Sequence, residues 1–496
     1  MYLIGYDIGS SSVKASIIEA SSGKCLASAF YPKTEMAIKA IKPGWAEQDS
    51  EKWWENLKLA TADILKLSKI NPSDIAGIGI SYQMHGLVII DKSHKALRPS
   101  IIWCDSRAVE IGEKAFNEIG SVQCLSSLLN SPGNFTASKL KWVKDNEPNI
   151  YKQIYKIMLP GDYIAMRLTG EACTTVSGLS EGIMWDFKNN SVASFLLNHY
   201  GFNESFIPTI VPTFSEQGKV TAEAASELGL AKGIPVSYRA GDQPNNAFSL
   251  NVLNPGEIAA TAGTSGVVYG ISQKIQYDPQ SRVNTFAHVN HQKNKTRLGV
   301  LLCINGTGIL NSWIRKNTGF ADVAYDALDI TASEIAIGSE GLVMLPFGNG
   351  AERMLGNKNI GCQISNIGFN HHTNNHMFRA AQEGVVFAFH YGMEIMKQIG
   401  INPSVIRAGN ANMFLSPIFR ETLAGISGAT IELYNTDGAQ GAARGAGIGA
   451  GIYKSFSEAF LGLQKLQTIQ PNTLNRQLYI DAFENWKKYL EKLTTI

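Results

Sequence analysis

Two short turns of glycine and hydroxyl residues, each enclosed by strand-like apolar runs, stand about half a chain apart. The first turn follows residues 2–8 and precedes residues 13–18. The second turn follows residues 258–262 and precedes residues 266–269. After each turn, small and β-branched side chains alternate, a pattern that predicts a second strand and not a helix. We therefore expect each half of the chain to open with a β-hairpin.

The remaining pattern mixes strands and helices in both halves. Helical segments are predicted at 51–60, in a loop-rich stretch at 108–230, and after an apolar strand that ends near Arg407. Strands are predicted at 75–81, 87–91 and 233–240. A chain of 496 residues is too long for one ordinary core. We expect two α/β domains, residues 1–248 and 249–496, with a cleft between them.

Composition narrows the class of protein. Hydrophobic residues make up 44% and charged residues 17%, as in folded globular chains. The net charge of +2 gives no electrostatic footprint for nucleic acid or an anionic membrane. The six cysteines have neither CxxC nor zinc-ligand spacing, which favours reduced thiols in a cytoplasmic protein. We expect no signal peptide and no membrane span.

The two turns have the chemistry of anion sites. Ser10, Ser11 and Ser12 follow Gly9, while Thr264 and Ser265 follow Gly263. Backbone N–H groups and hydroxyls in such turns can converge on one phosphate. Asp7, just before the first turn, is suited to hold Mg²⁺ against those phosphates, although a lone aspartate there could simply cap the turn. Lys14 is either a phosphate counter-charge or a solvated strand residue.

Two further polar groups follow predicted strands. Asp242 comes at the end of the strand at 233–240, where it could accept a proton from a substrate hydroxyl during phosphoryl transfer. The alternative is a capping aspartate before Pro244. Gln83, Met84 and His85 end another strand and suit a polyol, with an apolar wall from the methionine. The alternative for His85 is a satisfied structural group.

Other features have structural interpretations of equal weight. Asp105 with Arg107, and Glu352 with Arg353, are expected to be ordinary loop ion pairs. Gly409, Asn410 and Asn412 stand at a predicted helix start, where they either approach a purine or cap the helix. The small residues at 438–450 predict a closely packed helix beneath a nucleotide site. The chain contains neither a Walker A motif nor a dinucleotide-type GxGxxG after its first strand.

With these residues in view, nearly the whole chain resembles the FGGY family of carbohydrate kinases. The resemblance rests on residues 6–14 (YDIGSSSVK), 83–86 (QMHG), 135–140 (FTASKL), 159–163 (LPGDY), 241–243 (GDQ) and 262–265 (AGTS). The pair Met84-His85 is similar to that of family members that act on xylulose, since those acting on glycerol have Arg-Glu there. Residues 408–413 (AGNANM) depart from the family's glycine-rich adenosine turn.

The resemblance implies two ribonuclease-H-like domains, as in actin, that close on ATP and a sugar. Asp242 would be the catalytic base, and Asp7 and Asp242 would serve Mg²⁺. The ketose would be held by residues of the first half of the chain, namely Gln83, Met84, His85, Trp103, Asp242 and Gln243. The nucleotide would be held by Ser10, Ser11, Ser12, Lys14, Gly263, Thr264, Ser265, Gly308, Gly409, Asn410 and Asn412.

These expectations define an ATP-dependent kinase that converts D-xylulose to D-xylulose 5-phosphate. Another ketose or polyol, such as D-ribulose, is the alternative substrate. An actin-like nucleotide-dependent chaperone or a sugar sensor is the alternative outside enzymes, but neither uses Asp242 together with the turn at 83–85. The expected partners are a small-molecule sugar and a nucleotide, without nucleic acid or membrane, and any assembly is expected to be a homodimer.

Overall fold

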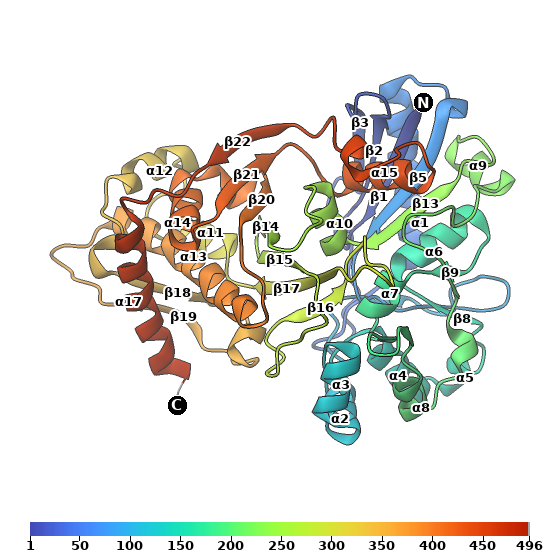
Figure 1. Cartoon of the computed structure of the whole chain (residues 1–496), viewed down its shortest axis with the longest axis horizontal. Helices are drawn as coiled ribbons and strands as arrows, with labels where there is room; N and C mark the ends of the chain where they lie inside the picture. The colour runs from blue at the N-terminus through green and yellow to red at the C-terminus, as the bar shows by residue number, and fades with distance from the viewer. Residues whose placement is uncertain (495–496) are drawn as a thin grey trace.

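Two large mixed β-sheets, one in each half of the chain, carry the fold (Figure 1). The structure, a computed structural model, describes residues 1–494. The first sheet has the order β13-β5-β1-β2-β3. Strands β1, β2 and β3 are antiparallel neighbours, whereas β5 and β13 run parallel to β1. Its strands are β1 (Tyr2–Ile8), β2 (Val13–Glu19), β3 (Cys25–Tyr31), β5 (Ile75–Tyr82) and β13 (Val236–Gly241).

The second sheet has the order β16-β17-β15-β14-β20-β21-β22. Strands β14, β20 and β21 are parallel, and the other neighbours are antiparallel. Its strands are β14 (Glu257–Ala262), β15 (Gly266–Ser272), β16 (Asn284–Ala287), β17 (Leu298–Ile304), β20 (Val405–Gly409), β21 (Thr430–Tyr434) and β22 (Lys465–Ile469).

The inner five strands of the second sheet, β17-β15-β14-β20-β21, repeat the order and directions of the first sheet. Hairpin β1–β2 therefore corresponds to hairpin β14–β15, and β13 corresponds to β21. Both hairpins expected from the glycine-hydroxyl turns are confirmed. This repeat brings the ends of β1 and β14, and the turns that follow them, to equivalent places in the two halves.

Helices and short strands fill the rest of the first half. Trp53 and Leu57 of α1 pack on the face of the first sheet that carries Ile4 and Tyr6, so the helix expected at 51–60 is confirmed and extends further. The helices are α1 (Ser50–Ser68), α2 (Val109–Ile119), α3 (Ser121–Leu128), α4 (Thr136–Asn146), α5 (Pro148–Tyr151), α6 (Pro160–Thr169), α7 (Val176–Glu181), α8 (Ser194–Tyr200), α9 (Ala222–Leu228), α10 (Asp242–Ser249), and the 3₁₀ turns η1 (Pro72–Asp74) and η2 (Glu204–Phe206). The short strands are β4 (Glu47–Gln48), β6 (Val88–Ile90), β7 (Ser100–Ile101), β8 (Lys156–Met158), β9 (Cys173–Thr174), β10 (Trp185–Asp186), β11 (Ser191–Val192) and β12 (Thr209–Ile210).

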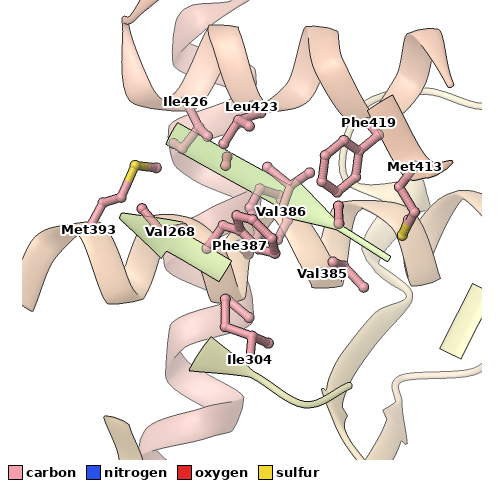
Figure 2. Packing of buried hydrophobic residues seen from close by; sticks show 14 of the residues in the cluster. Val268, Ile304, Val385, Val386, Phe387, Met393, Met413, Phe419, Leu423 and Ile426 are labelled. Atoms are coloured by element: carbon pink, nitrogen blue, oxygen red, sulfur yellow. The ribbon is translucent and has the colours of Figure 1, made fainter. Parts of the chain in front are cut away.

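The core of the second half is built around the long buried helix α13 (Asn374–Gln398). Figure 2 shows Val385, Val386 and Phe387 of this helix packed among strand residues such as Val268 and residues of α14 (Pro417–Ser427) such as Phe419 and Leu423. The other elements of this half are α11 (Gly308–Asn317), α12 (Tyr325–Ser333), α14 (Pro417–Ser427), α16 (Phe456–Ala459), α17 (Arg476–Thr494), η3 (Ser339–Gly341), η4 (Arg353–Leu355), η5 (Asn412–Leu415), β18 (Val343–Phe347) and β19 (Gly361–Ser365).

Helix α15 (Gly438–Gly449) links the two halves, because it follows β21 in the chain but packs on β1, β2, β5 and β13 of the first sheet (Figure 1). Its small residues permit this contact. A Cβ on Gly5 would lie 1.8 Å from Ala439 O, and one on Gly79 would lie 2.0 Å from Ala442 O. The close packing expected from residues 438–450 is therefore confirmed, against the first sheet.

Two expected absences can be compared with the described residues. No helix within residues 1–494 is long and apolar enough to cross a membrane. All six cysteines, each of which lies in the described part of the chain, are free thiols.

Candidate active site

Asp7 lies in β1, where the strand approaches the first turn, and neighbouring strands fix its side chain. Lys14 of β2 and Ser81 of β5 are its register partners. Ser81 Oγ donates to Asp7 Oδ1 at 2.9 Å. Burial raises the pKa of Asp7, the charge on Lys14 and the Ser81 hydrogen bond oppose that rise, and the charge on Asp437 adds to it. The Asp7 carboxylate is therefore held by Ser81 of the neighbouring strand β5, and not by capping its own turn.

Asp242 is the first residue of α10, directly after β13. Burial raises its pKa to about 7, and the negative charge on Asp7 contributes to the rise. Asn245 of the same helix donates from Nδ2 to Gly438 O of α15 at 2.9 Å. A Cβ on Gly438 would in turn lie 2.6 Å from Asp7 Oδ2. The starts of α10 and α15 and the end of β1 therefore meet at one place, with two carboxylates.

The turn at 83–85 borders the same place. Gln83 N donates to Ile8 O at 2.8 Å, and Gln83 Nε2 donates to Gln48 Oε1 at 3.2 Å. Gln83 Oε1 is buried and has no hydrogen-bond partner among residues 1–494. A Cβ on Gly241 would lie 2.6 Å from Met84 Cγ, so Met84 packs directly beside the residue that precedes Asp242.

His85 has a defined tautomer. Its Nδ1 lies 2.9 Å from the backbone oxygen of Glu181, which can only accept, so Nδ1 carries the proton and Nε2 presents a lone pair. Burial lowers the pKa of His85 to about 3, with further lowering by the charges on Lys139 and Arg353. The backbone at His85 is left-handed, with φ of 61°. The ring is therefore a neutral acceptor at physiological pH.

Two charged residues beside this turn were missed by the sequence reasoning. Glu181 ends α7, and a Cβ on Gly241 would lie 2.6 Å from its Oε2. Burial raises the pKa of Glu181 well above its usual range, the hydrogen bond from Tyr82 opposes the rise, and the charges on Asp242 and Asp162 add to it.

Lys139, the second of these residues, is fully buried and donates from Nζ to His85 O at 2.9 Å. Burial lowers the pKa of Lys139 to about 7. Lys139 belongs to the FTASKL motif at residues 135–140, so this motif could have identified it as a site residue from the sequence.

The first turn is braced from several directions. Gly9 N donates to Ser12 O at 3.0 Å, which closes the turn. Gln48 Nε2 donates to Ser10 O at 2.6 Å, and Trp103 Nε1 donates to Ser10 Oγ at 3.3 Å. Trp103 is 53% exposed, whereas Gln48 is buried. Ser11 and Lys14 are exposed, so the turn offers its hydroxyls to solvent while its backbone is fixed.

The second turn borders a cavity of about 560 Å³. Gly308 N donates to Gly263 O at 2.8 Å, and a Cβ on Gly308 would lie 2.4 Å from that oxygen. Gly308 therefore allows helix α11 to begin directly on the turn. The lining residues are Ala262, Gly263, Thr264, Gly308, Ile309, Asn311, Ser312, Tyr325, Asp329, Asn412, Met413, Leu415 and Ser416.

The cavity brings together some of the expected nucleotide residues and not others. Gly263, Thr264, Gly308 and Asn412 line it. In the described chain, Ser265, Gly409 and Asn410 are not among its lining residues. Gly409 ends β20, and Asn410 N donates to Tyr434 O at 3.0 Å, which ties that segment to β21.

Asp329 of α12 was not found from the sequence, although it lies in this cavity. Its Oδ1 accepts from Gln382 Nε2 at 2.8 Å and from Ser416 Oγ at 2.9 Å. Burial raises its pKa, and the two hydrogen bonds oppose the rise. Its partners come from α13 and from the residue before α14, so no local pattern marks it.

The two expected ion pairs have different outcomes. Asp105 and Arg107 pair at 2.7 Å, fully buried, and Arg107 also contacts Glu47 at 2.7 Å. For Glu352, the observed contact is instead a hydrogen bond from Asn305 N to its Oε1 at 2.8 Å. Burial raises the pKa of Glu352 to about 7. No salt bridge joins Glu352 to Arg353 in the described residues; the charge on Arg353 instead helps to lower the pKa of His85.

The repeated sheet, the cavity beside the second turn and the buried carboxylates between the halves define the actin-like, ribonuclease-H-like class of ATPase folds. Comparison with known proteins identifies the family. The profile of the FGGY family of carbohydrate kinases, N-terminal domain, matches residues 2–249, and that of the C-terminal domain matches residues 258–452. The chain belongs to the FGGY family of carbohydrate kinases. It is therefore a phosphotransferase with ATP and a sugar as its small-molecule substrates.

Individual relatives agree over the full length. The chain is 30% identical to a xylulose kinase of Escherichia coli (strain K12), which covers 99% of both chains. It is 31% identical to a xylulose kinase of Staphylococcus xylosus, covering 98% of this chain and 99% of the relative. The structure of a xylulose kinase from Rhodospirillum rubrum superposes with a TM-score of 0.89 at 26% identity, covering 99% of both chains. The expected fold class and family are confirmed.

Proposed function

We propose that this protein transfers the γ-phosphoryl group of ATP to the terminal hydroxyl of D-xylulose, which yields D-xylulose 5-phosphate and ADP. The observation that carries the proposal is the contact between the turn at 83–85 and the start of α10: Met84 packs against Gly241, the residue before Asp242. A sugar bound at this turn has its reacting hydroxyl beside a carboxylate. The relatives named xylulose kinase support the choice of sugar.

Asp242 is the proposed base. Its pKa of about 7 lies near neutral pH. A general base with such a pKa is partly ionised at that pH and is still basic enough to accept a proton from a hydroxyl. The sugar oxygen attacks the γ-phosphorus, its proton passes to a carboxylate oxygen of Asp242, and the bond to the ADP oxygen breaks. Because the transition state of phosphoryl transfer is loose, orienting the hydroxyl is the larger part of this role.

The proposed sugar site combines directional polar atoms with an apolar wall. His85 Nε2 has a lone pair for a sugar hydroxyl, and Gln83 Oε1 is a buried acceptor with no hydrogen-bond partner in the described chain. Met84 supplies the wall. Trp103 and Gln243 complete the proposed set. A buried acceptor that lacks a partner is strained until a ligand donor reaches it.

Mg²⁺ is the proposed metal, and the residues present fit it. Asp7 and Asp242 supply carboxylate oxygens, the ligands that Mg²⁺ prefers, and Gly438 leaves the space next to Asp7 Oδ2 free of side-chain atoms. When bound, the ion would neutralise charge on the transferring phosphoryl group. In this scheme Ser81 keeps Asp7 oriented, through its 2.9 Å hydrogen bond.

For the nucleotide, we propose that the two turns hold the phosphates and the cavity of about 560 Å³ holds the nucleoside. Ser10, Ser11, Ser12 and Lys14 act from the first turn, and Gly263, Thr264 and Ser265 from the second. Gly308 and Asn412 line the cavity. Gly409 and Asn410 are proposed to act at its edge, since only Ala411 separates Asn410 from Asn412 in the chain.

A related sugar is the second candidate. A relative named L-xylulose/3-keto-L-gulonate kinase, from Escherichia coli (strain K12), is 27% identical over 99% of this chain. A full-length relative is thus named for other sugars, and D-ribulose stays the alternative from the sequence. A chaperone or a sugar sensor does not account for membership in a kinase family.

An ADP-release assay with purified protein, Mg²⁺ and a panel of free sugars tests the proposal. We expect the highest kcat/KM with D-xylulose, against L-xylulose, D-ribulose, L-ribulose and glycerol. Sugar-dependent ADP release that is higher with D-ribulose would transfer the assignment to the alternative. The absence of sugar-dependent ADP release across the panel would overturn the role proposed for the turn at 83–85.

Three further expectations belong to this proposal. The division into residues 1–248 and 249–496 is proposed with the qualification that α15 packs on the first sheet. A homodimer is the proposed assembly, to be measured by light scattering. A cytoplasmic location is supported by the six free thiols in the described chain, since such thiols persist in reducing compartments.

A further inference from the structure

One buried glutamine, Gln48, lies between the turn proposed for the phosphates and the turn proposed for the sugar. It ends the short strand β4 and directly precedes Asp49, the N-cap of helix α1. Its side chain is outside the set of residues proposed to touch sugar or nucleotide. Its amide contacts groups of Ser10, Ala37, Trp53 and Gln83. Any role of Gln48 in the reaction is therefore exerted through these neighbours.

Two of the neighbours fix the orientation of the Gln48 amide. The indole Nε1 of Trp53, a fully buried residue of α1, can only donate, and it donates to Gln48 Oε1 at 3.1 Å. The backbone oxygen of Ser10 can only accept, and Gln48 Nε2 donates to it at 2.6 Å. A flipped amide would place two oxygens together at Ser10 and two N–H groups together at Trp53. Only one orientation of the amide therefore satisfies both neighbours.

The orientation of Gln48 in turn determines that of Gln83. Gln48 Oε1 can only accept, so the atom of the Gln83 amide that faces it at 3.2 Å is Nε2. The backbone of Gln83 is held separately, by the hydrogen bond from its N to Ile8 O at 2.8 Å. Gln83 Oε1 is then the free branch of the amide, buried and without a partner in residues 1–494. Two linked amides thus make this position of the sugar site a hydrogen-bond acceptor.

The same glutamine braces the phosphate turn. Gln48 Nε2 donates to Ser10 O and also lies 3.4 Å from Ala37 O. The segment that carries Ala37 contacts the turn as well, because Met36 N donates to Ser11 O at 2.8 Å. The backbone that presents the serine hydroxyls is therefore fixed by the side chain that orients the acceptor of the sugar site.

We propose that Gln48 is a positioning residue of this kinase, which fixes the acceptor that Gln83 offers to the sugar and aligns the phosphate turn at Ser10 with it. This inference rests on the proposed function. A sugar hydroxyl meets an acceptor that is already oriented, so binding does not have to select one of two amide orientations. The sugar and the phosphate chain are held on one hydrogen-bonded frame. Such alignment matters because a misplacement of about 1 Å can cost about 10²-fold in rate.

The test compares the kinetics of the full-length wild type with those of Gln48→Met, whose side chain has a similar length but no amide. The sugar is D-xylulose, or whichever sugar of the panel gives the highest kcat/KM. We expect Gln48→Met to lower kcat/KM for that sugar by about tenfold or more, because the oriented acceptor and the braced turn are both lost. The KM for ATP should rise by about two- to tenfold, as expected for the loss of one hydrogen bond at the phosphate turn.

The matched control is Gln153→Met. Gln153 is exposed, and its Nε2 donates to the nearby Asn149 O at 2.8 Å. This variant should have the kinetic constants of the wild type. Thermal unfolding of every variant measures whether it is folded at the assay temperature.

A double-mutant cycle separates positioning from a merely structural role. Gln83→Met removes the acceptor itself, so Gln48→Met should raise the KM for the sugar much less in that background than in the wild type. Gln83→Met should leave the KM for ATP unchanged, whereas Gln48→Met raises it. If Gln48→Met does not fold, Trp53→Phe replaces it, because this variant keeps Gln48 but removes the donor that orients its amide. Trp53→Phe should raise the KM for the sugar by about two- to tenfold.

The outcomes distinguish this inference from the proposed function. A wild type without sugar-dependent ADP release would overturn the proposed function, and the inference with it. An active wild type together with a Gln48→Met variant that behaves like Gln153→Met would overturn the role of Gln48 alone. That role is equally overturned if the effects of Gln48→Met and Gln83→Met on the KM for the sugar simply multiply. Where Trp53→Phe is the variant measured, a KM for the sugar equal to that of the wild type overturns it.

Discussion

Asp7 in β1 and Asp242, which directly follows β13, interact through their charges. Burial raises the pKa of Asp242 to about 7, and the negative charge on Asp7 adds to the rise. Two carboxylates in one partly dehydrated place repel each other unless one is protonated or a cation lies between them. The pair is thus arranged so that binding of a divalent cation and ionisation of Asp242 favour each other.

The first prediction concerns Asp242 as the base. Asp242→Asn should reduce kcat by about 10² or more, since a positioned general base typically contributes 10²–10⁴. Binding of the sugar should be affected much less, because an amide keeps the shape of the side chain. Steady-state kinetics and sugar binding by calorimetry measure the two effects. Asp74→Asn, at an exposed carboxylate of η1, is the control and should leave both unchanged. A kcat near that of the wild type in folded Asp242→Asn would exclude Asp242 from the reaction.

The second prediction follows from the raised pKa of Asp242. A carboxyl whose pKa is higher in the folded state favours folding in its protonated form. This contribution is full below pH 3.8 and is lost as the pH rises through about 7. Asp242→Asn removes the ionisation, so its Tm should exceed that of the wild type at pH 8 and approach it at pH 5. Calorimetric scans of both proteins without Mg²⁺ measure this difference. Equal pH profiles would contradict the raised pKa.

The third prediction concerns the sugar site. His85→Asn preserves the left-handed backbone, which asparagine adopts readily, but removes the acceptor at Nε2. An unpaired sugar hydroxyl should cost about 1–3 kcal/mol, or one to two decades in kcat/KM for D-xylulose. The KM for ATP should hardly change. Because the pKa of His85 is about 3, its imidazole should add no limb to the pH profile between pH 5 and 8. An ATP-binding defect would contradict the assignment.

The fourth prediction concerns closure. The two turns belong to different halves of the chain, and neither surrounds a phosphate chain by itself. Sugar and a non-hydrolysable ATP analogue together should therefore reduce the radius of gyration measured by small-angle X-ray scattering. Each ligand alone should have a smaller effect. An unchanged radius with both ligands bound would indicate that the site is formed in advance.

The sequence was sufficient where function depends on local patterns. The alternation after Gly9 and Gly263 identified both hairpins, and the strand before Asp242 put that residue at a carboxyl end. Strand ends of a parallel sheet converge, so Asp7, Gln83 and Asp242 could be placed together without coordinates. The packing of residues 438–450 could be expected from their small side chains, but not the sheet on which they pack.

The sequence was insufficient where distant segments meet. Glu181 reaches the active site from the end of α7, and Asp329 reaches the cavity from α12; neither is preceded by a recognisable motif. Contacts of this kind depend on the path of the whole chain, which hydrophobic periodicity does not determine.

The last prediction separates activity from stability at Gly438. This residue begins α15, and an added Cβ would lie 2.6 Å from Asp7 Oδ2 and 3.0 Å from Asp7 Cγ. Asp7 is short and is tied to Ser81, so its carboxylate can yield only by leaving its position. A displacement of about 1 Å at a catalytic group can cost 10²-fold in rate, and we expect a loss of about that size for Gly438→Ala. Alanine has a higher helix propensity than glycine, so the Tm should stay the same or rise.

The control is Gly368→Ala, because an added Cβ there has only ordinary van der Waals contacts, from 3.8 Å. This variant should keep full activity. Kinetics at saturating Mg²⁺ and thermal scans of both variants measure the two quantities. If Gly438→Ala were as active as the wild type, the position of the Asp7 carboxylate would not limit the reaction, and its proposed role with the metal would fail.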